Sequence, residues 1–149
     1  MTTGTQDDKG IDEPERLSSA TCLELLRSVA IGRIAVATAD GGTDIFPVNF
    51  VVDHGTVVFR TAPGTKVDRI LATQRAAFEA DHFDWYERIA WSVVLKGEAS
   101  VVHSTDEVAA LFDVQVVPWH PSDKPYFVRL VPDSTTGRRF HVDDPRHGG

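Results

Sequence analysis

The sequence predicts a mainly β protein, a small antiparallel barrel of six to seven strands with short flanking helices. Short apolar runs, several of them alternating with polar residues, are separated by turn sequences such as Asp40-Gly41-Gly42 and Asp53-His54-Gly55. Helical spacing is confined to brief segments, and no internal repeat is present. The expected strands cover residues 33–39, 45–53, 56–61, 77–81, 91–103, 126–131 and 136–142.

Helices are expected where apolar residues recur every three or four positions. The first candidate covers residues 17–29, with Cys22 on its apolar face and Gly32 as the residue that ends it. Its possible caps are Ser18, Ser19 and Thr21. Cys22 is expected to pack as a small hydrophobe. Two shorter helices are expected, over residues 66–73 and after Ser104.

Two strands contain residues that interrupt an otherwise regular pattern. Pro47 cannot donate a ladder hydrogen bond, so its strand should be an edge, a bulge or open to a ligand at that point. Asn49 is polar within an apolar run and needs a partner if it is buried. Gly97, inside the long strand 91–103, indicates a bulge or a close backbone approach.

The chain of 149 residues is long enough for one domain with its own core. We expect that domain over residues 17–142, between disordered tails at 1–16 and 143–149. The single cysteine excludes an intramolecular disulfide, and no apolar run is long enough for a membrane span or a signal core, so a cytoplasmic protein is expected. The net charge is -7, and the tails account for -4 of it; the remaining mildly acidic body argues against nucleic acid or a membrane as partner.

Several kinds of catalytic site are excluded by pattern. The sequence contains no GxGxxG, no GxSxG and no P-loop, since Lys66 follows Thr65 and not glycine. The six histidines include no pair at i, i+4 and none beside the cysteine, so no metal site is expected.

The segment VVFRTAPGTK, residues 57–66, gathers two cations and two hydroxyls around one Pro-Gly turn. Alternation along strand 56–61 places Val57, Phe59 and Thr61 on one face and Val58 and Arg60 on the other. Backbone N–H groups at the start of the next helix could join these side chains on one phosphate. The candidate anchors are Arg60, Thr61, Thr65 and Lys66. The alternative is a solvated hairpin end.

Six stretches together resemble the short pyridoxamine 5′-phosphate oxidase-like proteins, flavin-binding split-barrel proteins common in actinobacteria. They are GRIAV (32–36), DIFPVNFVVD (44–53), VVFRTAPGTK (57–66), WSVVLKGEA (91–99), the pair Pro118-Trp119, and TGRRF (136–140). The resemblance extends over nearly all of residues 17–142. It implies a split β-barrel that forms a homodimer with two flavin sites at the dimer interface.

The resemblance also implies roles for individual residues. Arg60, Thr61, Thr65 and Lys66 would hold the phosphate of FMN. Pro47, Val48, Asn49 and Phe50 would run along the isoalloxazine ring, with backbone groups of their strand bonding its edge. Trp91, Ser92, Trp119 and Arg138 would approach from the other subunit. Two simpler roles stay open: Asn49 could bond a neighbouring strand, and Trp119 could pack in a core or an interface.

We therefore expect a cytoplasmic homodimer that binds FMN non-covalently and exchanges electrons with a small substrate. The flavin would carry the chemistry, so no general acid or base is assigned. One alternative is a reductase that uses the deazaflavin F420; another is a non-catalytic module that sequesters flavin or haem. Arg139-Phe140-His141 has the Arg-x-His spacing of the full-length oxidases without the Trp-Gln-Gly-Arg pattern around it, so oxidation of pyridoxamine phosphate is not expected.

Overall fold

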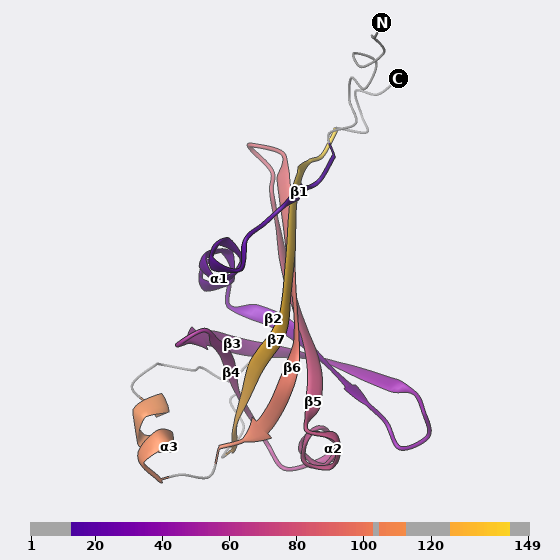
Figure 1. Ribbon diagram of the computed structural model, residues 1–149, viewed down its shortest axis with the longest axis vertical. Coiled ribbons are helices and arrows are strands. Elements are labelled where there is room, and N and C mark those ends of the chain that lie inside the picture. Colours follow the sequence, from indigo (N-terminus) through magenta and orange to yellow (C-terminus); the bar gives the residue numbers. More distant parts are fainter. Residues whose placement is uncertain (1–12, 103–104, 113–125, 144–149) are drawn as a thin grey trace, which may run out of the picture.

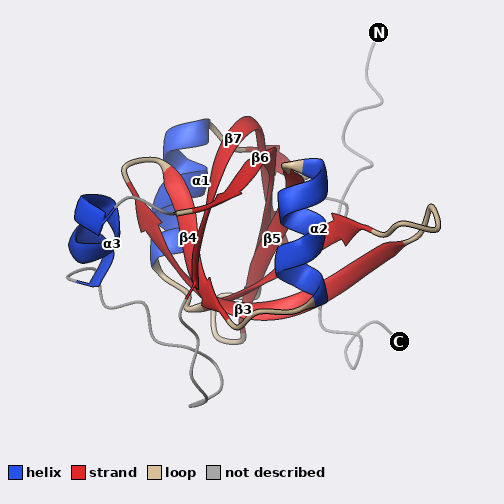
Figure 2. Ribbon diagram, turned by 90° about the horizontal axis from the view of Figure 1, so that it is seen from below, coloured by secondary structure: helices blue, strands red, loops and turns tan. Residues whose placement is uncertain are grey.

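Seven strands and three helices make up the protein in a computed structural model, which describes residues 13–102, 105–112 and 126–143. The strands are β1 (Glu15–Arg16), β2 (Ile31–Ala37), β3 (Thr43–Asp53), β4 (Thr56–Thr61), β5 (Arg75–Asp84), β6 (Ile89–Val101) and β7 (Tyr126–His141). They are antiparallel in the order β1-β7-β4-β3-β2-β5-β6, and a further pairing of β6 with β7 closes β2 to β7 into a barrel (Figures 1 and 2). The predicted antiparallel split barrel is confirmed.

The helices are α1 (Ser19–Arg27), α2 (Thr65–Thr73) and α3 (Thr105–Phe112). Of the possible caps for the first helix, Ser18 takes the role, since its side chain accepts a hydrogen bond from the N–H of Thr21 (3.1 Å). Cys22 is fully buried on the face of α1 that packs against the barrel, and burial raises the pKa of its thiol. The expected packing role of Cys22 is therefore confirmed.

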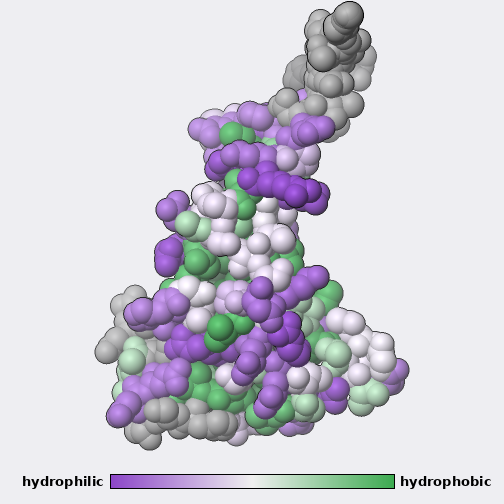
Figure 3. Space-filling view, in the orientation of Figure 1, coloured by the Kyte–Doolittle hydropathy of each residue, from purple (hydrophilic) through white to green (hydrophobic). Residues whose placement is uncertain are grey.

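The barrel core is built from alternate residues of each strand. Val57 and Phe59 of β4 point into the main core, whereas Val58 belongs to a second, smaller cluster with Phe127 on the outer face. This confirms the alternation expected for residues 56–61. The molecule narrows from the barrel body toward the end where β1 lies, and α2 is at the broad end (Figures 1 and 3). Figure 3 shows polar side chains over much of one face of this shape.

Two glycines are required by close packing. A Cβ on Gly97 would come within 2.0 Å of the carbonyl oxygen of Val131, and the ladder of β6 with β7 shifts register between Lys96 and Gly97. The expected bulge at Gly97 is thus confirmed. Gly32 does not end the first helix, which stops at Arg27; it lies in β2, where a Cβ would come within 2.3 Å of the Phe78 ring.

Two boundaries also differ from expectation. The two expected strands 126–131 and 136–142 form one strand, β7, because Pro132 faces the bulge at Gly97 and the ladder resumes beyond it. Within the expected N-terminal tail, Glu15–Arg16 pair with Arg138 and Arg139 of β7, and the guanidinium of Arg139 bonds the carboxylate of Glu15.

Candidate functional site

The two edges of strand β3 are paired over different parts of its length. Its ladder with β2 runs from Thr43 to Asn49, whereas its ladder with β4 covers only Phe50–Asp53. In the described part of the chain, therefore, the β4 side of β3 has no strand partner over residues 43–49. We call this side the open edge. An unpaired strand edge presents N–H and C=O groups that can bind another molecule.

Backbone alternation decides which groups face the open edge. The N–H of Phe50 donates to the carbonyl of Ala30 (3.1 Å), on the side of β2. Because backbone direction alternates along a strand, the N–H groups of Ile45 and Asn49 and the carbonyl of Pro47 face the opposite, open side. Pro47 thus removes no ladder hydrogen bond, and its strand has an edge at this point, which is one of the three alternatives expected for it.

The side chain of Asn49 leaves an acceptor without a partner at the same place. Its Oδ1 is buried and accepts no hydrogen bond from the described residues, whereas Nδ2 lies 3.4 Å from the carbonyl oxygen of Ala30. The alternative in which Asn49 only bonds a neighbouring strand accounts for Nδ2 but not for Oδ1. A buried acceptor without a donor is costly, so a donor from a bound molecule would stabilise it.

Val48 and Phe50 are the other two residues of this strand predicted to contact the ring, and their side chains point away from the outer face. Val48 and Phe50 are buried in the core, and the Phe50 ring meets the Phe78 ring edge to face with 4.7 Å between centroids. Pro47 is exposed on the outer face. A ligand along this strand would meet Val48 and Phe50 through their backbone, and Pro47 and Asn49 also through their side chains.

Beyond the end of β4 the chain turns into α2. Gly64 precedes the helix with φ of 154°, a conformation that favours glycine, and no side chain caps the first turn. The leading N–H groups of α2 therefore have no capping side chain in the part of the chain that the structure describes, as in helices that bind anions. Thr61 is buried at the end of β4, and Thr65, the first helical residue, is exposed.

The two cations of the VVFRTAPGTK segment reach toward different faces. The Lys66 ammonium lies 4.8 Å from the centroid of the Phe46 ring and 5.9 Å from that of Phe59, beside the start of the open edge. The Arg60 guanidinium lies 5.1 Å from the centroid of Phe127, on the outer face. Thr65 and Lys66 are thus together at α2, and Arg60 approaches from the other side of β4.

The remaining predicted residues lie on β6 and β7. Trp91 is buried in the core at 6% exposure. Ser92 and Arg138 are direct neighbours on the outer face, since the β6–β7 ladder pairs them. Arg138 also pairs with Arg16 of β1, toward the end of the molecule far from α2 (Figure 1). Trp119 falls outside the described residues. Contact of any of these four residues with a ligand stays a prediction.

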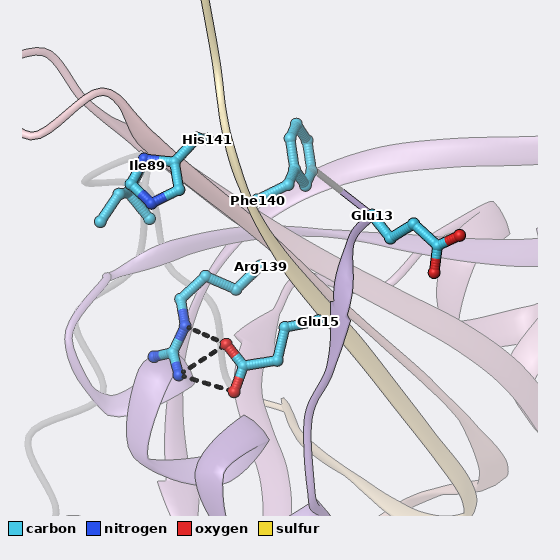
Figure 4. Close-up of a pocket in the computed structure, with 6 residues that line it drawn as sticks. All are labelled: Glu13, Glu15, Ile89, Arg139, Phe140 and His141. Carbon is cyan, nitrogen blue, oxygen red and sulfur yellow. Dashed lines mark hydrogen bonds and ion pairs between the residues drawn. The ribbon is translucent and has the colours of Figure 1, made fainter. Parts of the chain in front are cut away.

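A hollow of about 260 Å³ lies beside β1. Its lining is Glu13, Glu15, Ile89, Arg139, Phe140 and His141 (Figure 4). The Arg139 guanidinium donates from Nε and Nη2 to the Glu15 carboxylate at 3.2 Å, as the dashed lines of Figure 4 show. Its charge is therefore already paired, which argues against the use of this Arg-x-His segment to bind a phosphate.

The outer face next to the open edge combines apolar side chains with an ionic cluster. Ile45 is 67% exposed and lines an apolar hollow of about 260 Å³ that also includes Val94. The Arg33 guanidinium bonds Glu79 (2.9 Å) and Asp81 (3.3 Å). Burial and the neighbouring Asp81 raise the pKa of Glu79. The hydrogen bond that Arg33 donates to Glu79 raises the pKa of Arg33.

Phe46 is a site residue that the sequence reasoning missed. Its ring lies under the Lys66 ammonium, and this places the cation beside β3. Alternation gives a signal for it, because Phe46, Val48 and Phe50 occupy one face of the strand. Among the described residues, no group of three or more His, Cys, Asp or Glu could hold a metal ion. None of the described helices is long and apolar enough to cross a membrane.

The chain belongs to the pyridoxamine 5′-phosphate oxidase family, whose model matches residues 18–139. This family assignment agrees with the split barrel and with the resemblance seen in the sequence.

Three solved structures are similar to this chain, at different levels of sequence identity. A Corynebacterium glutamicum protein, provisionally named a pyridoxamine 5′-phosphate oxidase, is 38% identical with a TM-score of 0.77, covering 91% of this chain and all of its own. The FAD binding protein from Mycobacterium smegmatis is also 38% identical, with a TM-score of 0.70 and coverage of 85% and 98%. A heme binding protein from Mycobacterium smegmatis, 14% identical, shares the fold alone, with a TM-score of 0.60 and coverage of 80% and 53%.

Proposed function

We propose that the protein binds FMN non-covalently at the open edge of β3 and uses it to exchange electrons with a small substrate. The observation that carries this proposal is the open edge itself, which lies beside the uncapped start of α2 and the Lys66 ammonium. A flavin needs both features, because it joins a flat, hydrogen-bonding ring to a phosphate dianion. Membership of the family and the FAD binding relative support a flavin ligand.

The residues around α2 suit the phosphate. The first N–H groups of the helix, the hydroxyl of Thr65 and the ammonium of Lys66 supply donors and positive charge within one turn. Thr61 and Arg60 would complete the set from the end of β4. The Thr61 hydroxyl lies 3.3 Å from the carbonyl oxygen of Ala62.

The open edge suits the ring. The N–H of Asn49 and the carbonyl of Pro47 face it, and Asn49 Oδ1 is a buried acceptor that needs a donor. The isoalloxazine ring has both donors and acceptors along its polar edge, so it can satisfy these groups together. The residues present therefore fit a flavin.

The flavin, when bound, supplies the redox chemistry, and the protein supplies position and environment. Pro47 and Asn49 would orient the ring by hydrogen bonds at its edge. Lys66 and the α2 amides would fix the phosphate and thus set how far the ring reaches along β3. No described side chain is assigned as a general acid or base.

We also infer that two copies associate through the outer face of the sheet. Ile45 is 67% exposed and Ile31 is 37% exposed on this face. Exposed apolar surface such as the hollow beside Ile45 is typical of protein–protein contacts. Ser92 and Arg138 lie on the same outer face, so this arrangement would bring them toward a partner's site, as the family resemblance implies. Light scattering should give twice the mass of one chain; a monomer that binds FMN fully would contradict the inference.

The phosphate assignment is tested by titrating the apo-protein with FMN and following the quenching of flavin fluorescence. Wild type should saturate at one FMN per chain. Replacement of Lys66 and Arg60 together by alanine should weaken binding by about 100-fold or more, since each charge-assisted hydrogen bond contributes ~1.5–3 kcal/mol. Lys96→Ala, which removes an exposed lysine on β6, is the matched control and should bind as wild type.

Unchanged FMN affinity in the double variant would show that the phosphate is held elsewhere. A screen of electron donors on the loaded protein then separates the functional alternatives. Reduction of bound FMN by a nicotinamide supports the oxidoreductase, activity with reduced F420 and none with FMN supports the deazaflavin reductase, and a tightly bound flavin that no donor reduces supports a sequestering module.

A further inference from the structure

The outer face of β5 and β6 has apolar side chains at both of its ends. One end is the apolar hollow beside Ile45, which Ala77 and Val94 also line. At the other end, in the hairpin that joins β5 to β6, the Trp85 ring meets the Phe83 ring edge to face with 4.6 Å between centroids. Trp85 is 73% exposed, and this hairpin lies at the narrow end of the molecule (Figure 1). We call Phe83 and Trp85 the aromatic tip.

The aromatic tip lies on the same face of the sheet as the hollow. Ala77 and Phe83 are six residues apart on β5, and residues at even spacing along a strand share one face. The ladders extend this face from Phe83 to Ala90 of β6 and on to Phe140 of β7. A third aromatic ring therefore borders the tip and widens its apolar surface.

The hairpin turn holds the aromatic tip in a fixed shape. Asp84 Oδ1 accepts hydrogen bonds from the N–H groups of Tyr86 (2.9 Å) and Glu87 (3.0 Å). Arg88 ties the turn to the end of β7, because its Nε donates to the carbonyl of Val142 (3.2 Å) and its own carbonyl accepts from the Val142 N–H (2.8 Å). A tip that is already ordered loses less conformational entropy on binding, so this one is suited to a protein–protein contact.

Between its apolar ends the outer face carries charges of both signs. The guanidinium of Arg33 bonds two carboxylates, Glu79 at 2.9 Å and Asp81 at 3.3 Å. We call these three residues the acidic cluster, since it is one positive charge short. Arg138 is exposed on the same face, separated from Asp81 by Ser92 in the ladder, and bonds no carboxylate among the described residues. Its charge can therefore complete the acidic cluster of another molecule.

The spacing along β5 makes this face complementary to a second copy of itself. Ala77 in the hollow and Phe83 in the tip each lie three residues from Ala80, about 10 Å at the rise of an antiparallel strand. A two-fold axis perpendicular to the sheet near Ala80 would therefore place the aromatic tip of each copy over the hollow of the other. The same rotation would bring each Arg138 toward the acidic cluster of the other copy. Such an isologous contact closes after two chains.

The charges of this face suit a second copy better than other kinds of partner. A nucleic acid or an anionic membrane needs a broad basic surface, and the two carboxylates of the acidic cluster oppose it. A second copy offers an apolar counterpart to each apolar end, and it offers Arg138 to the acidic cluster.

We propose that the aromatic tip of one copy covers the hollow beside Ile45 of a second copy, so that the partner's Trp85 forms the outer wall of the flavin site. This inference rests on the proposed function of that site and on the association of two copies through this face. Ile45 connects the interface with the site, because its side chain lines the hollow and its N–H faces the open edge. An indole packed on Ile45 would exclude water from that edge and favour a flat ligand beside it.

Disulfide trapping tests this arrangement of the two copies. Within one chain, Ala77 and Phe83 alone are about 20 Å apart along β5, so Ile45 and Trp85 are too distant for a disulfide, which needs Cα atoms within about 7 Å. The double variant Ile45→Cys, Trp85→Cys should form a covalent dimer in oxidant at high protein concentration, and neither single variant should. Cys22 is buried and takes no part.

Substitution of Trp85 measures what the aromatic tip contributes. Trp85→Ala should weaken the association of two copies by about tenfold or more in sedimentation equilibrium, because a tryptophan at an interface often carries much of the binding energy. Its FMN affinity should fall by about threefold or more. Leu71→Ala, which removes an exposed apolar side chain of α2, is the matched control and should change neither quantity. Both positions are exposed, so both variants should fold as wild type.

Each failure points to a different part of the account. A covalent dimer from either single variant, or none from the double variant while wild type is dimeric, would overturn the arrangement and leave the proposed flavin site standing. Unchanged association or unchanged FMN affinity in Trp85→Ala would overturn the role of the aromatic tip. A wild type that forms the trapped dimer but binds no FMN would contradict the proposed function and support the contact between copies.

Discussion

The two halves of β3 lie in different surroundings although they belong to one strand. Over Phe50–Asp53 the strand is paired with β4, and Phe50 adds one hydrogen bond to Ala30 on the other side; over residues 43–49 it is paired with β2 alone. The paired half is apolar and ends in a tight turn. The open half carries Pro47, which lacks a donor, and Asn49, whose Oδ1 has no partner among the described residues. Residues that would weaken a central strand are thus confined to the half whose β4 side has no strand partner among the described residues.

This difference shows that one strand can stabilise the core and also offer a binding edge. Side chains of both halves that point inward, such as Val48 and Phe50, contribute to the core. The backbone of the open half joins β3 to β2, but by alternation only the groups of residues 44, 46 and 48 face β2, and those of Ile45, Pro47 and Asn49 take no part in that ladder. The groups on the open edge can therefore bind a ligand without loss of the ladder with β2.

The largest effect is expected from a core substitution in the paired half. Phe50→Ala removes a buried ring that contacts Phe78, and should lower the free energy of unfolding by ~3–5 kcal/mol. Chemical denaturation measures it. Thr43→Ala, at an exposed position of the open half, is the control and should change stability by no more than about 0.5 kcal/mol. Equal losses in the two variants would contradict the separation.

A smaller effect on stability, and of the opposite sign, is expected from a substitution of Asn49. Asn49→Ala removes a buried acceptor that no described residue bonds, so the apo-protein should keep its stability or gain up to about 1 kcal/mol. FMN affinity should nevertheless fall about tenfold, because a bond to the ring is lost. Denaturation of the apo-protein and an FMN titration measure the two quantities. A destabilised variant with normal FMN affinity would assign Asn49 to the fold and not to the site.

Local alternation predicted much of this arrangement. Alternation correctly placed Phe59 in the core and Arg60 on the outer face. Pro47 indicated an edge, a bulge or an open position in its strand. It would also have placed Trp91 in the core, since Trp91, Val93 and Leu95 share one face of β6.

The parts that sequence could not predict depend on contacts between distant residues. The extent of the open edge follows from where β4 stops pairing with β3, and the continuity of β7 follows from the bulge at Gly97. The placement of α2 against β2 depends on the hydrogen bond from Arg69 to the carbonyl of Ala37, a contact between residues 32 positions apart. Periodicity carries no information about such pairings, because it reports only which residues of one element share a face.

The most direct test of the open edge is residue-resolved amide hydrogen exchange, with and without FMN. The N–H groups of Ile45 and Asn49 face the open edge, whereas those of Val51 and Asp53 face β4. Our account predicts that FMN slows exchange at Ile45 and Asn49 by about tenfold or more, while Val51 and Asp53 are already slow in the apo-protein. Bound FMN with unchanged exchange at Ile45 and Asn49 would show that the flavin lies elsewhere.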